Sequence, residues 1–331
     1  MKVSVVGAGV MGLATGRVLA QRGHDVTVYE QFELKHKRGS SHGTSRIFRL
    51  SYDEGYWIRL AQRAYELWRE LERESGRTLL ELDGLVDVQR TPKRRVEALN
   101  GAGISVEELT PADALERFGF AYDDVESLVF TRDAGIALAD ATIDALADGA
   151  RAAGAEILEN TRVEALDDVP GERVVVTAGG WAPKLLGLGA LDAKPTRETT
   201  VYFRGERIPS LIDELGDQFY ALTAPGMGVK AGWHKGGRPT DPDDEDAEPD
   251  ERVVEAVSGW VAQRLPRVDP EPIRAETCIY TNVADESFVC ERRGRYVIGS
   301  ACSGHGFKFA PSVGENLADL AVRNAPHFRR G

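Results

Sequence analysis

The residues of this 331-residue chain that could do chemistry begin with three closely spaced glycines, Gly7, Gly9 and Gly12. This spacing lets a backbone turn tightly, approach a pyrophosphate and then pack a helix against a strand. The N–H groups and the positive dipole end of such a helix bind phosphate. Glu30 ends the next predicted strand, where it would accept hydrogen bonds from ribose hydroxyls. The set predicts a dinucleotide site and leaves FAD and NAD open.

A second glycine-rich turn, Ser303-Gly-His-Gly-Phe-Lys-Phe309, precedes a predicted helix near the end of the chain. The N-terminus of that helix would suit the partial negative charge of a reduced isoalloxazine ring. An NAD dehydrogenase needs no such terminal turn, so this motif favours FAD. The alternative is an ordinary helix cap with basic residues nearby by chance.

The three cysteines, Cys278, Cys290 and Cys302, form neither a CxxC pair nor a disulfide framework. By default each is a small buried hydrophobic residue. A cysteine thiolate is a strong nucleophile where basic groups lower its pKa, and it could attack a flavin methyl group to give a thioether. Spacing alone does not decide between these readings for Cys278, which follows a strand-like run.

Strands and helices of one sheet must position these motifs. Lys2–Val6 and Asp25–Tyr29 are predicted as short strands on either side of a helix that ends near Gly23, which places the first glycine turn where strand meets helix. The other predicted elements are helices over about 56–74, 110–118, 139–153 and 313–322, and strands over about 82–88, 174–177 and 295–298. This α/β pattern implies pieces of one nucleotide-binding sheet at both ends and in the middle of the chain.

Composition excludes several classes of protein. The formal net charge of -12 argues against a nucleic-acid partner, which needs a basic surface. We expect a cytoplasmic protein without a membrane partner, because no apolar run could span a bilayer and the N-terminus lacks a signal peptide. The acidic segment 241–251 has no metal-loop spacing and is predicted to be a solvated surface loop, so no metal is expected.

Six motifs, in one order along nearly the whole chain, resemble the monomeric sarcosine oxidase family of FAD-dependent oxidoreductases, which are similar to D-amino acid oxidase and include N-methyltryptophan and pipecolate oxidases. The motifs are Gly7 to Gly12, Gly39 to Arg49 with Glu54, Ala178 to Trp181, Gly228 to His234, Cys278 to Thr281, and Ser303 to Lys308. Together they are much more specific than any one of them alone.

The resemblance implies roles for individual residues. Cys278 corresponds to the covalent attachment point of the flavin, and Lys230 to the lysine that activates oxygen, with Arg46 as its basic neighbour. Arg49 and Lys308 correspond to the pair that holds the substrate carboxylate. Physical chemistry supports both roles, because a buried carboxylate needs opposing cations and a fixed cation stabilises developing superoxide.

The resemblance also implies which residues surround the substrate and the cofactor. Around the substrate it places His234, Tyr220, Tyr280 and His305. Around the cofactor it places Gly7, Gly9, Met11, Gly12, Glu30, His42, Ser45, Val163, Gly179, Trp181, Cys278, Gly304, Gly306 and Lys308, with Trp181 packing at the cofactor edge.

The expected architecture is a glutathione-reductase-like FAD-binding Rossmann domain, from residues 1–79, 131–194 and 283–331. A substrate domain built on an antiparallel sheet takes 80–130 and 195–282. The chain is shorter than is usual for the family, and the stretch from 163 to 174 leaves little room for the β-meander normally found there. The stretch from 82 to 118 is also trimmed, and the pocket-wall positions that set substrate size are poorly matched.

The implied reaction is oxidation of an amino acid, sarcosine-like or another N-methyl or secondary amino acid. The substrate, with its amine neutral, loses a hydride to the flavin, the imine hydrolyses, and oxygen is reduced to hydrogen peroxide. We expect a monomer. The alternatives are a flavin dehydrogenase that passes electrons to a carrier, a non-catalytic FAD-binding module and an NAD-dependent amino acid dehydrogenase. Lys230 counts against the first, and Arg49 with Lys308 against the second.

Overall fold

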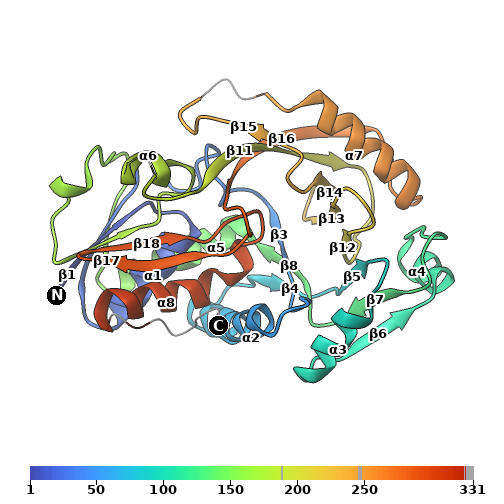
Figure 1. The fold of residues 1–331 in the computed structure, drawn as a ribbon, viewed down its shortest axis with the longest axis horizontal. Helices are drawn as coiled ribbons and strands as arrows, with labels where there is room; N and C mark the ends of the chain where they lie inside the picture. Colours follow the sequence, from blue (N-terminus) through green and yellow to red (C-terminus); the bar gives the residue numbers. More distant parts are fainter. Residues whose placement is uncertain (188, 245–247, 324, 326–331) are drawn as a thin grey trace.

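The computed structural model describes residues 1–187, 189–244, 248–323 and 325. The described residues form two large sheets and one small sheet, and helices cover the large sheets (Figure 1). The chain passes between the sheets more than once, so each large sheet joins strands that are far apart in the sequence.

The six-stranded sheet has the strand order β17-β18-β10-β1-β2-β9. Its strands are β1 (Lys2–Val6), β2 (Asp25–Tyr29), β9 (Glu156–Leu158), β10 (Arg173–Val176), β17 (Val289–Arg293) and β18 (Tyr296–Ser300). Neighbours are parallel except β17, which pairs antiparallel with β18. Val3 and Val5 pack in one core while Val6 packs in another, so both faces of β1 are covered. A parallel sheet covered on both faces explains the continuous valine runs of β1 and β10.

Helices α1 (Val10–Gln21), α5 (Ala139–Ala152) and α8 (Ala310–Arg323) pack beside this sheet (Figure 1). Gly314 lets α8 approach α1, since a Cβ atom at this position would lie 2.7 Å from the Cβ of Ala14. Helix α2 (Gly55–Ser75) packs against α5 and α8 with its apolar face, which includes Trp57, Leu60 and Trp68. The first glycine turn therefore lies on a rigid strand and helix.

The second large sheet has the order β15-β11-β14-β13-β12-β5-β7-β6, and β16 also pairs with β11. Its strands are β5 (Leu85–Val88), β6 (Val106–Leu109), β7 (Leu128–Thr131), β11 (Lys194–Phe203), β12 (Ser210–Asp213), β13 (Phe219–Ala224), β14 (Gly228–Trp233), β15 (Arg238–Pro239) and β16 (Pro272–Asn282). It is antiparallel except where β5 pairs with β12. Helix α7 (Glu251–Arg264) covers it and buries Val257 and Trp260.

Shorter elements connect the two large sheets. The third sheet consists of β3 (Ser45–Phe48), β8 (Gly135–Leu138) and β4 (Leu80–Glu81). The remaining elements are α3 (Lys93–Gly101), α4 (Pro111–Phe118), α6 (Ala182–Leu186), and the 3-10 turns η1 (Leu166–Asp168), η2 (Gly179–Trp181) and η3 (Phe307–Phe309). Strand β3 contacts β13 and η3, so it links the antiparallel sheet to the C-terminal turn.

The predicted α/β class is confirmed, because a parallel sheet with flanking helices occurs together with a mainly antiparallel sheet. The predicted helix over 110–118 is α4, and Thr110 caps it by accepting a hydrogen bond from the backbone N–H of Asp113. The strand expected over 82–88 is β5, which begins only at Leu85. Gly84 precedes it with a φ of +96°, and its N–H donates to the carbonyl oxygen of Ala134.

Other expectations change in detail. The last helix begins at Ala310, directly after η3, and not near Val313. Cys278 does not follow a strand, because it lies inside β16. Residues 163–172, all of which the structure describes, contain the turn η1 and no strand, as the shortness of this stretch predicts. Of the acidic segment 241–251, residues 245–247 lie outside the described residues.

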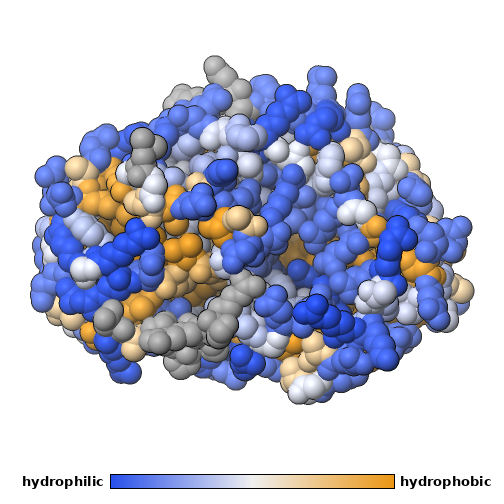
Figure 2. Space-filling model, in the orientation of Figure 1, coloured by the Kyte–Doolittle hydropathy of each residue, from blue (hydrophilic) through white to orange (hydrophobic). Residues whose placement is uncertain are grey.

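Polar residues dominate the surface in view (Figure 2). Figure 2 shows a mainly hydrophilic face, with apolar residues gathered over the half that carries β17, β18 and α6. None of the helices that the structure describes is long and apolar enough for a membrane span. In the same described part of the chain, no cluster of His, Cys, Asp and Glu could hold a metal ion.

Candidate active site

A cavity of about 970 Å³ is lined by residues from both large sheets and from the small sheet. This volume is at the upper end of the range of about 300–1,000 Å³ for ligand pockets. The β1–α1 turn and the end of β2 line it, as do the stretch from Gly39 to Arg49, strands β13, β14 and β16, and the turn before α8. One cavity thus brings together residues from the first and last parts of the chain.

The first glycine turn forms the part of the cavity that suits a nucleotide. Gly7 has a φ of +100°, and a Cβ atom there would lie 2.6 Å from the carbonyl oxygen of Thr177. Gly12 packs beneath the turn, where a Cβ atom would lie 1.8 Å from the carbonyl oxygen of Gly7. The buried Glu30 accepts hydrogen bonds from the N–H of Ala8 at 2.8 Å and of Phe32 at 3.1 Å. The backbone is therefore open to a pyrophosphate, with a carboxylate held beside it.

Several buried polar atoms on the cavity wall fit a polar ligand. The atoms without a hydrogen-bond partner among the described residues include His42 Nε2, Arg49 Nη1, Thr281 Oγ1 and Ser300 Oγ, and all four residues line the cavity. Native proteins leave few buried polar atoms unpaired, and a bound ligand is one of the usual partners. The glycine turn, Glu30 and the unpaired His42 Nε2 fit the FAD that the sequence predicts.

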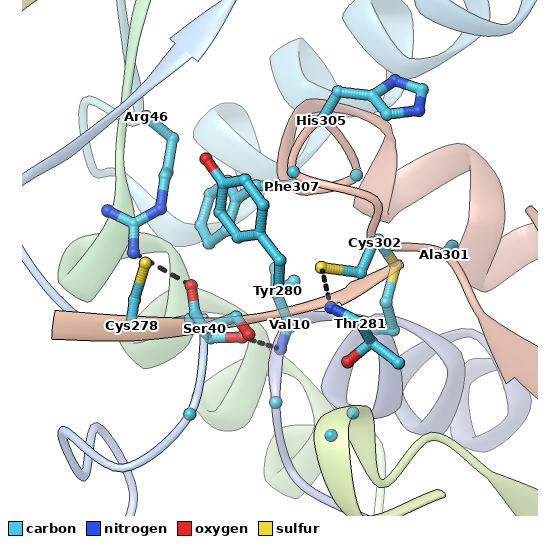
Figure 3. Close-up of a pocket in the computed structure, with 18 of the residues that line it drawn as sticks. Val10, Ser40, Arg46, Cys278, Tyr280, Thr281, Ala301, Cys302, His305 and Phe307 are labelled. Carbon is cyan, nitrogen blue, oxygen red and sulfur yellow. Dashed lines mark hydrogen bonds between the residues drawn. The ribbon is translucent and has the colours of Figure 1, made fainter. Parts of the chain in front are cut away.

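Lys230 and Arg46 converge on one backbone carbonyl. Lys230, on β14, donates from Nζ to the oxygen of Ser45 at 2.5 Å, and Arg46 Nη1 donates to the same oxygen at 2.9 Å. Arg46 also donates to the carbonyl oxygen of His42 at 2.6 Å. It donates to that of Ser40 at 2.9 Å as well (Figure 3). Burial, and then the Arg46 charge, lower the pKa of Lys230 well below its ordinary value. An anion that forms in the cavity beside this pair would be stabilised.

Cys278 lies close to these cations. Figure 3 shows its side chain beside that of Arg46 at the cavity wall. Burial raises the pKa of the Cys278 thiol to about 11, while Arg46 and Lys230 oppose that rise. Cys302 also lines the cavity, but its sulfur accepts a hydrogen bond from the N–H of Thr281 at 3.3 Å.

Arg49 and Lys308 form a second pair of buried cations. The Arg49 guanidinium lies 4.3 Å from the centre of the Tyr52 ring, and Lys308 Nζ lies 5.8 Å from the same centre. Lys308 Nζ donates to the carbonyl oxygen of His305 at 2.7 Å. Burial, and then the charge of Arg49, lower the pKa of Lys308 well below its ordinary value. Two cations this close would bind a carboxylate strongly, because it would relieve their repulsion.

The predicted imidazole and phenol groups line the same cavity as the two cation pairs. The rings of His234 and Tyr280 are 5.7 Å apart, and in Figure 3 the Tyr280 ring points from β16 toward the turn that carries His305. Burial lowers the pKa of His234 to about 4 and raises that of Tyr280 well above its ordinary value. Both groups are therefore neutral near pH 7. Tyr220, on β13, packs against the neighbouring strand β14, where a Cβ atom at Gly232 would lie 2.5 Å from its hydroxyl oxygen.

His305 packs into an aromatic cluster beside the Arg49 and Lys308 pair. Its ring is 5.0 Å from that of Trp57 and 4.9 Å from that of Phe288, and its Nδ1 is 3.5 Å from the Tyr52 hydroxyl. Burial lowers the pKa of His305 well below its ordinary value. This histidine is held by packing, and it is better placed to shape the cavity than to move a proton across it.

The structure brings the predicted site residues together with one exception. Gly12 does not line the cavity, because it packs under the glycine turn. Trp181 Nε1 donates to Asp243 at 2.7 Å, so part of the acidic segment packs against a residue that lines the cavity. The predicted residues that do line the cavity are Gly7, Gly9, Met11, Glu30, His42, Ser45, Arg46, Arg49, Val163, Gly179, Trp181, Tyr220, Lys230, His234, Cys278, Tyr280, Gly304, His305, Gly306 and Lys308.

Sequence reasoning missed the residues that support the Arg49 end of the cavity. Tyr52 and Trp57 follow Arg49 closely, and their position after a cationic motif was the available signal. Asp87 contacts Arg49 from behind, and a lone carboxylate inside the apolar strand β5 was its signal. Arg95 contacts Asp87 from α3, and nothing in its local sequence distinguishes it from a surface arginine.

Comparisons with known proteins agree with this geometry. A family model described as FAD dependent oxidoreductase (DAO) matches residues 2–320. The chain is 31% identical to the peroxisomal sarcosine oxidase of Homo sapiens over 366 aligned residues, which cover 98% of this chain and 93% of the relative. It is 30% identical to the monomeric sarcosine oxidase of Bacillus sp. (strain B-0618), with 97% and 92% covered.

Solved structures give the same result. NikD, described as an unusual amino acid oxidase essential for nikkomycin biosynthesis, superposes in its open form with a TM-score of 0.86 at 28% identity, covering 99% of this chain and 95% of that one. The L-proline dehydrogenase from P. horikoshii has a TM-score of 0.86 at 23% identity and shows that the fold is shared. This chain belongs to the family of FAD-dependent oxidoreductases.

Proposed function

We propose that the protein oxidises the C–N bond of an amino acid to an imine and that oxygen is reduced to hydrogen peroxide. The observation that supports this most is the placement of Arg49 and Lys308 beside the ring of Tyr52, in the cavity that also holds the glycine turn and Lys230. A carboxylate site and a flavin site therefore share one cavity. NAD chemistry does not explain this arrangement, and the family is FAD-dependent.

The substrate is held by its carboxylate. Arg49 and Lys308 would bind it by charge-assisted hydrogen bonds, with the α-carbon directed toward the interior of the cavity. His234 and Tyr280 are neutral near pH 7. Neither therefore carries a negative charge that would favour the protonated form of the substrate amine over the neutral form. An amine without its proton has the lone pair that becomes part of the imine double bond.

Gly7, Gly9 and Glu30 would hold the nucleotide end of FAD, and His42 and Arg46 would face its ring system. When bound, FAD supplies the acceptor for the two electrons and the hydrogen that leave the substrate carbon. The imine then takes up water and releases an amine and a carbonyl compound. The electrons and two protons convert oxygen to hydrogen peroxide.

Lys230 would act in the oxygen half of the cycle. Transfer of the first electron to oxygen creates superoxide, a negative charge that does not exist before this step. The buried cation of Lys230, fixed by the Ser45 carbonyl and next to Arg46, would stabilise that charge. This role favours an oxidase over a dehydrogenase that passes electrons to a carrier.

For the substrate class, we propose an N-methyl or other secondary amino acid. The support is that relatives named sarcosine oxidase are 30–31% identical over nearly the whole chain. A screen of N-methyl, cyclic and primary amino acids with peroxide-coupled detection tests this directly. Peroxide formation from a secondary amino acid is the expected result. Formation from primary amino acids alone would contradict the substrate class, and none from any amino acid would contradict the function.

We also propose that the flavin is covalently attached to Cys278 through a thioether. Support comes from the position of Cys278 at the cavity wall beside Arg46 and Lys230, whose charges oppose the rise of its pKa that burial causes. Acid precipitation of the purified protein should leave the yellow colour in the pellet, and the Cys278→Ala variant should release it to the supernatant. The Cys290→Ala variant is the matched control and should retain the colour. Complete release from the wild type would contradict covalent attachment.

Two statements about the whole chain are also proposals. The FAD-binding domain would comprise residues 1–79, 131–194 and 283–331, and the substrate domain 80–130 and 195–282. The proposed state in solution is a monomer, for which the support is the name of the monomeric sarcosine oxidase relatives. Its expected location in the cytoplasm stays a prediction.

A further inference from the structure

Arg49 contacts a buried carboxylate that does not line the cavity. Asp87 Oδ1 lies 3.5 Å from Arg49 Nη1, and the Asp87 side chain is 0% exposed. Asp87 comes from β5 of the antiparallel sheet, whereas Arg49 follows β3 of the small sheet. The contact therefore joins two parts of the fold directly behind the proposed carboxylate site.

The distance between Asp87 and Arg49 is long for a hydrogen bond, and this has a consequence for Arg49. Arg49 Nη1 makes an ion pair with Asp87 but has no hydrogen-bond partner among the described residues. The carboxylate attracts the guanidinium and limits its orientation, and Nη1 keeps its capacity to donate. A carboxylate in the cavity would take that hydrogen bond.

Other residues keep Asp87 from moving closer to Arg49. Arg95 Nη1 donates to the same Oδ1 atom at 3.0 Å, and Ser51 donates from Oγ to Oδ2. Arg95 is itself fixed, because Nε donates to Asp53 at 3.0 Å and Nη2 lies 3.2 Å from Glu214. The side chain of Arg95 is 5% exposed, whereas its partners Asp53 and Glu214 are 34% and 22% exposed and line the cavity with it.

The charge state of Asp87 depends on the same neighbours. Burial raises the pKa of Asp87, and the guanidiniums of Arg95 and Arg49 oppose that rise. Without Arg95, the carboxylate would pair fully with Arg49 and compete with a substrate for it. Arg95, on helix α3, would thus prevent Asp87 from pairing fully with Arg49.

We propose that Asp87, held by Arg95 and Ser51, is a positioning residue that orients Arg49 toward the substrate carboxylate while leaving its Nη1 to bind it. This inference rests on the proposed function, because it needs a carboxylate-bearing substrate. Asp87 would touch neither substrate nor cofactor, and it would act only through Arg49.

The test compares binding of methoxyacetate, which resembles N-methylglycine but has no amine to oxidise, with binding of methoxyacetamide, which has no carboxylate. Titration of the FAD-loaded protein, followed by the flavin absorbance, gives a dissociation constant for each. In the wild type the acid should bind more tightly than the amide. The Asp87→Asn variant should bind the acid about tenfold more weakly and the amide with unchanged affinity, because the amide does not use the Arg49 cation.

Asp213→Asn is the matched control. Asp213 is a buried aspartate on β12, next to β5, where it accepts hydrogen bonds from Tyr122 and Trp260 at 2.9 Å. Its loss should lower stability without changing the ratio of acid to amide affinity. If Asp87→Asn does not fold, Ser51→Ala decides. It removes one support of the same carboxylate and should weaken acid binding about two- to threefold, again with no change for the amide.

The outcomes separate this inference from the function. Acid binding that is unchanged or tighter in Asp87→Asn, or in Ser51→Ala where that variant decides, would overturn the positioning role. An equal loss for acid and amide would reduce the role of Asp87 to general stability and would also overturn it. In these cases peroxide formation from an amino acid would still support the proposed function. If the wild type does not prefer the acid to the amide, the carboxylate site is wrong, and the proposed function fails with it.

Discussion

At the scale of single residues, the carbonyl oxygen of Ser45 has two cationic donors, Lys230 and Arg46. Lys230 is 3% exposed and lies on the central strand β14, so its ammonium group cannot be replaced by water without rearrangement. A charge fixed in this way needs no reorganisation when an anion forms beside it. The oxygen reaction should therefore depend on Lys230 more than substrate oxidation does.

The Lys230→Met variant tests this difference. It retains the apolar stem of the side chain and removes the charge, so the reduced protein should react with oxygen more slowly by a factor on the order of a hundred. Reduction by the amino acid should change much less, since no anion develops beside Lys230 in that step. Stopped-flow mixing measures the two rates separately. The exposed Lys194→Met variant should behave like the wild type, and an unchanged oxygen rate in Lys230→Met would remove Lys230 from the proposed role.

The two cations of the carboxylate site predict a pH dependence. Burial and Arg49 lower the pKa of Lys308, and a bound carboxylate favours its protonated form. The affinity for methoxyacetate should therefore be highest at pH values below the lowered pKa of Lys308. It should fall as the pH rises through that pKa, by up to about tenfold per pH unit.

The Lys308→Met variant should lose this pH dependence and should bind methoxyacetate more weakly by about 1.5–3 kcal/mol at low pH. Methoxyacetamide should show little dependence in either protein. Titrations across the pH range measure both effects. A wild-type affinity that rises with pH would contradict the assignment of Lys308 to the carboxylate.

At the scale of elements, helix α2 holds the turn that carries Lys308. Trp68 lies on α2, is 0% exposed, and donates from Nε1 to the carbonyl oxygen of Lys308 at 2.8 Å. Lys308 lies within η3, directly before α8, so this bond ties the turn to the helix that packs on it. The position of the carboxylate site thus depends on an indole that does not line the cavity.

The Trp68→Phe variant removes this hydrogen bond and leaves a buried carbonyl oxygen without its partner. The free energy of unfolding should fall by about 1–3 kcal/mol, with a further contribution from the smaller ring. Urea denaturation followed by circular dichroism measures the change. Glu66→Gln, at an exposed position on the same helix, should stay within about 0.5 kcal/mol of the wild type. If Trp68→Phe also changes the free energy of unfolding by no more than about 0.5 kcal/mol, the hydrogen bond from Trp68 does not fix the turn that carries Lys308.

Local patterns predicted the elements that do not depend on distant partners. The strand, glycine turn and helix at the N-terminus and the Thr110 cap of α4 follow from nearby residues, and the structure has them. The extent of β16 could not be predicted in this way. It forms because its residues pair with β11 along ten positions of register, and nothing local to Cys278 shows that partner.

The same physical reason separates the predicted and the missed parts of the site. The residues of the cavity wall belong to motifs that the family resemblance identifies, so their numbers could be named in advance. Asp87 and Arg95 contact the site only through the folded arrangement of β5, α3 and the loop after β3. Such contacts between separate elements are set by tertiary packing and leave only a weak local signal, such as a carboxylate among Leu85, Val86 and Val88.

At the scale of the whole molecule, the two large sheets supply different parts of the reaction site. The parallel sheet carries the glycine turn and Glu30, and the antiparallel sheet carries Lys230, Tyr280 and Cys278. The turn before α8 adds Lys308. Because the cavity is lined from all of these elements, substrate oxidation and oxygen reduction would take place in one cavity.

The most direct test of this account follows both halves of the reaction in one sample of wild-type protein. Anaerobic mixing with a secondary amino acid should bleach the visible flavin absorbance, and admission of oxygen should restore it with formation of equimolar hydrogen peroxide. Both steps are expected because the carboxylate site and the Lys230 cation line the same cavity. Failure of every amino acid to bleach the flavin would contradict amino acid oxidation. Bleaching that an artificial acceptor reverses, but oxygen does not, would show that the protein is a dehydrogenase and contradict the oxidase account.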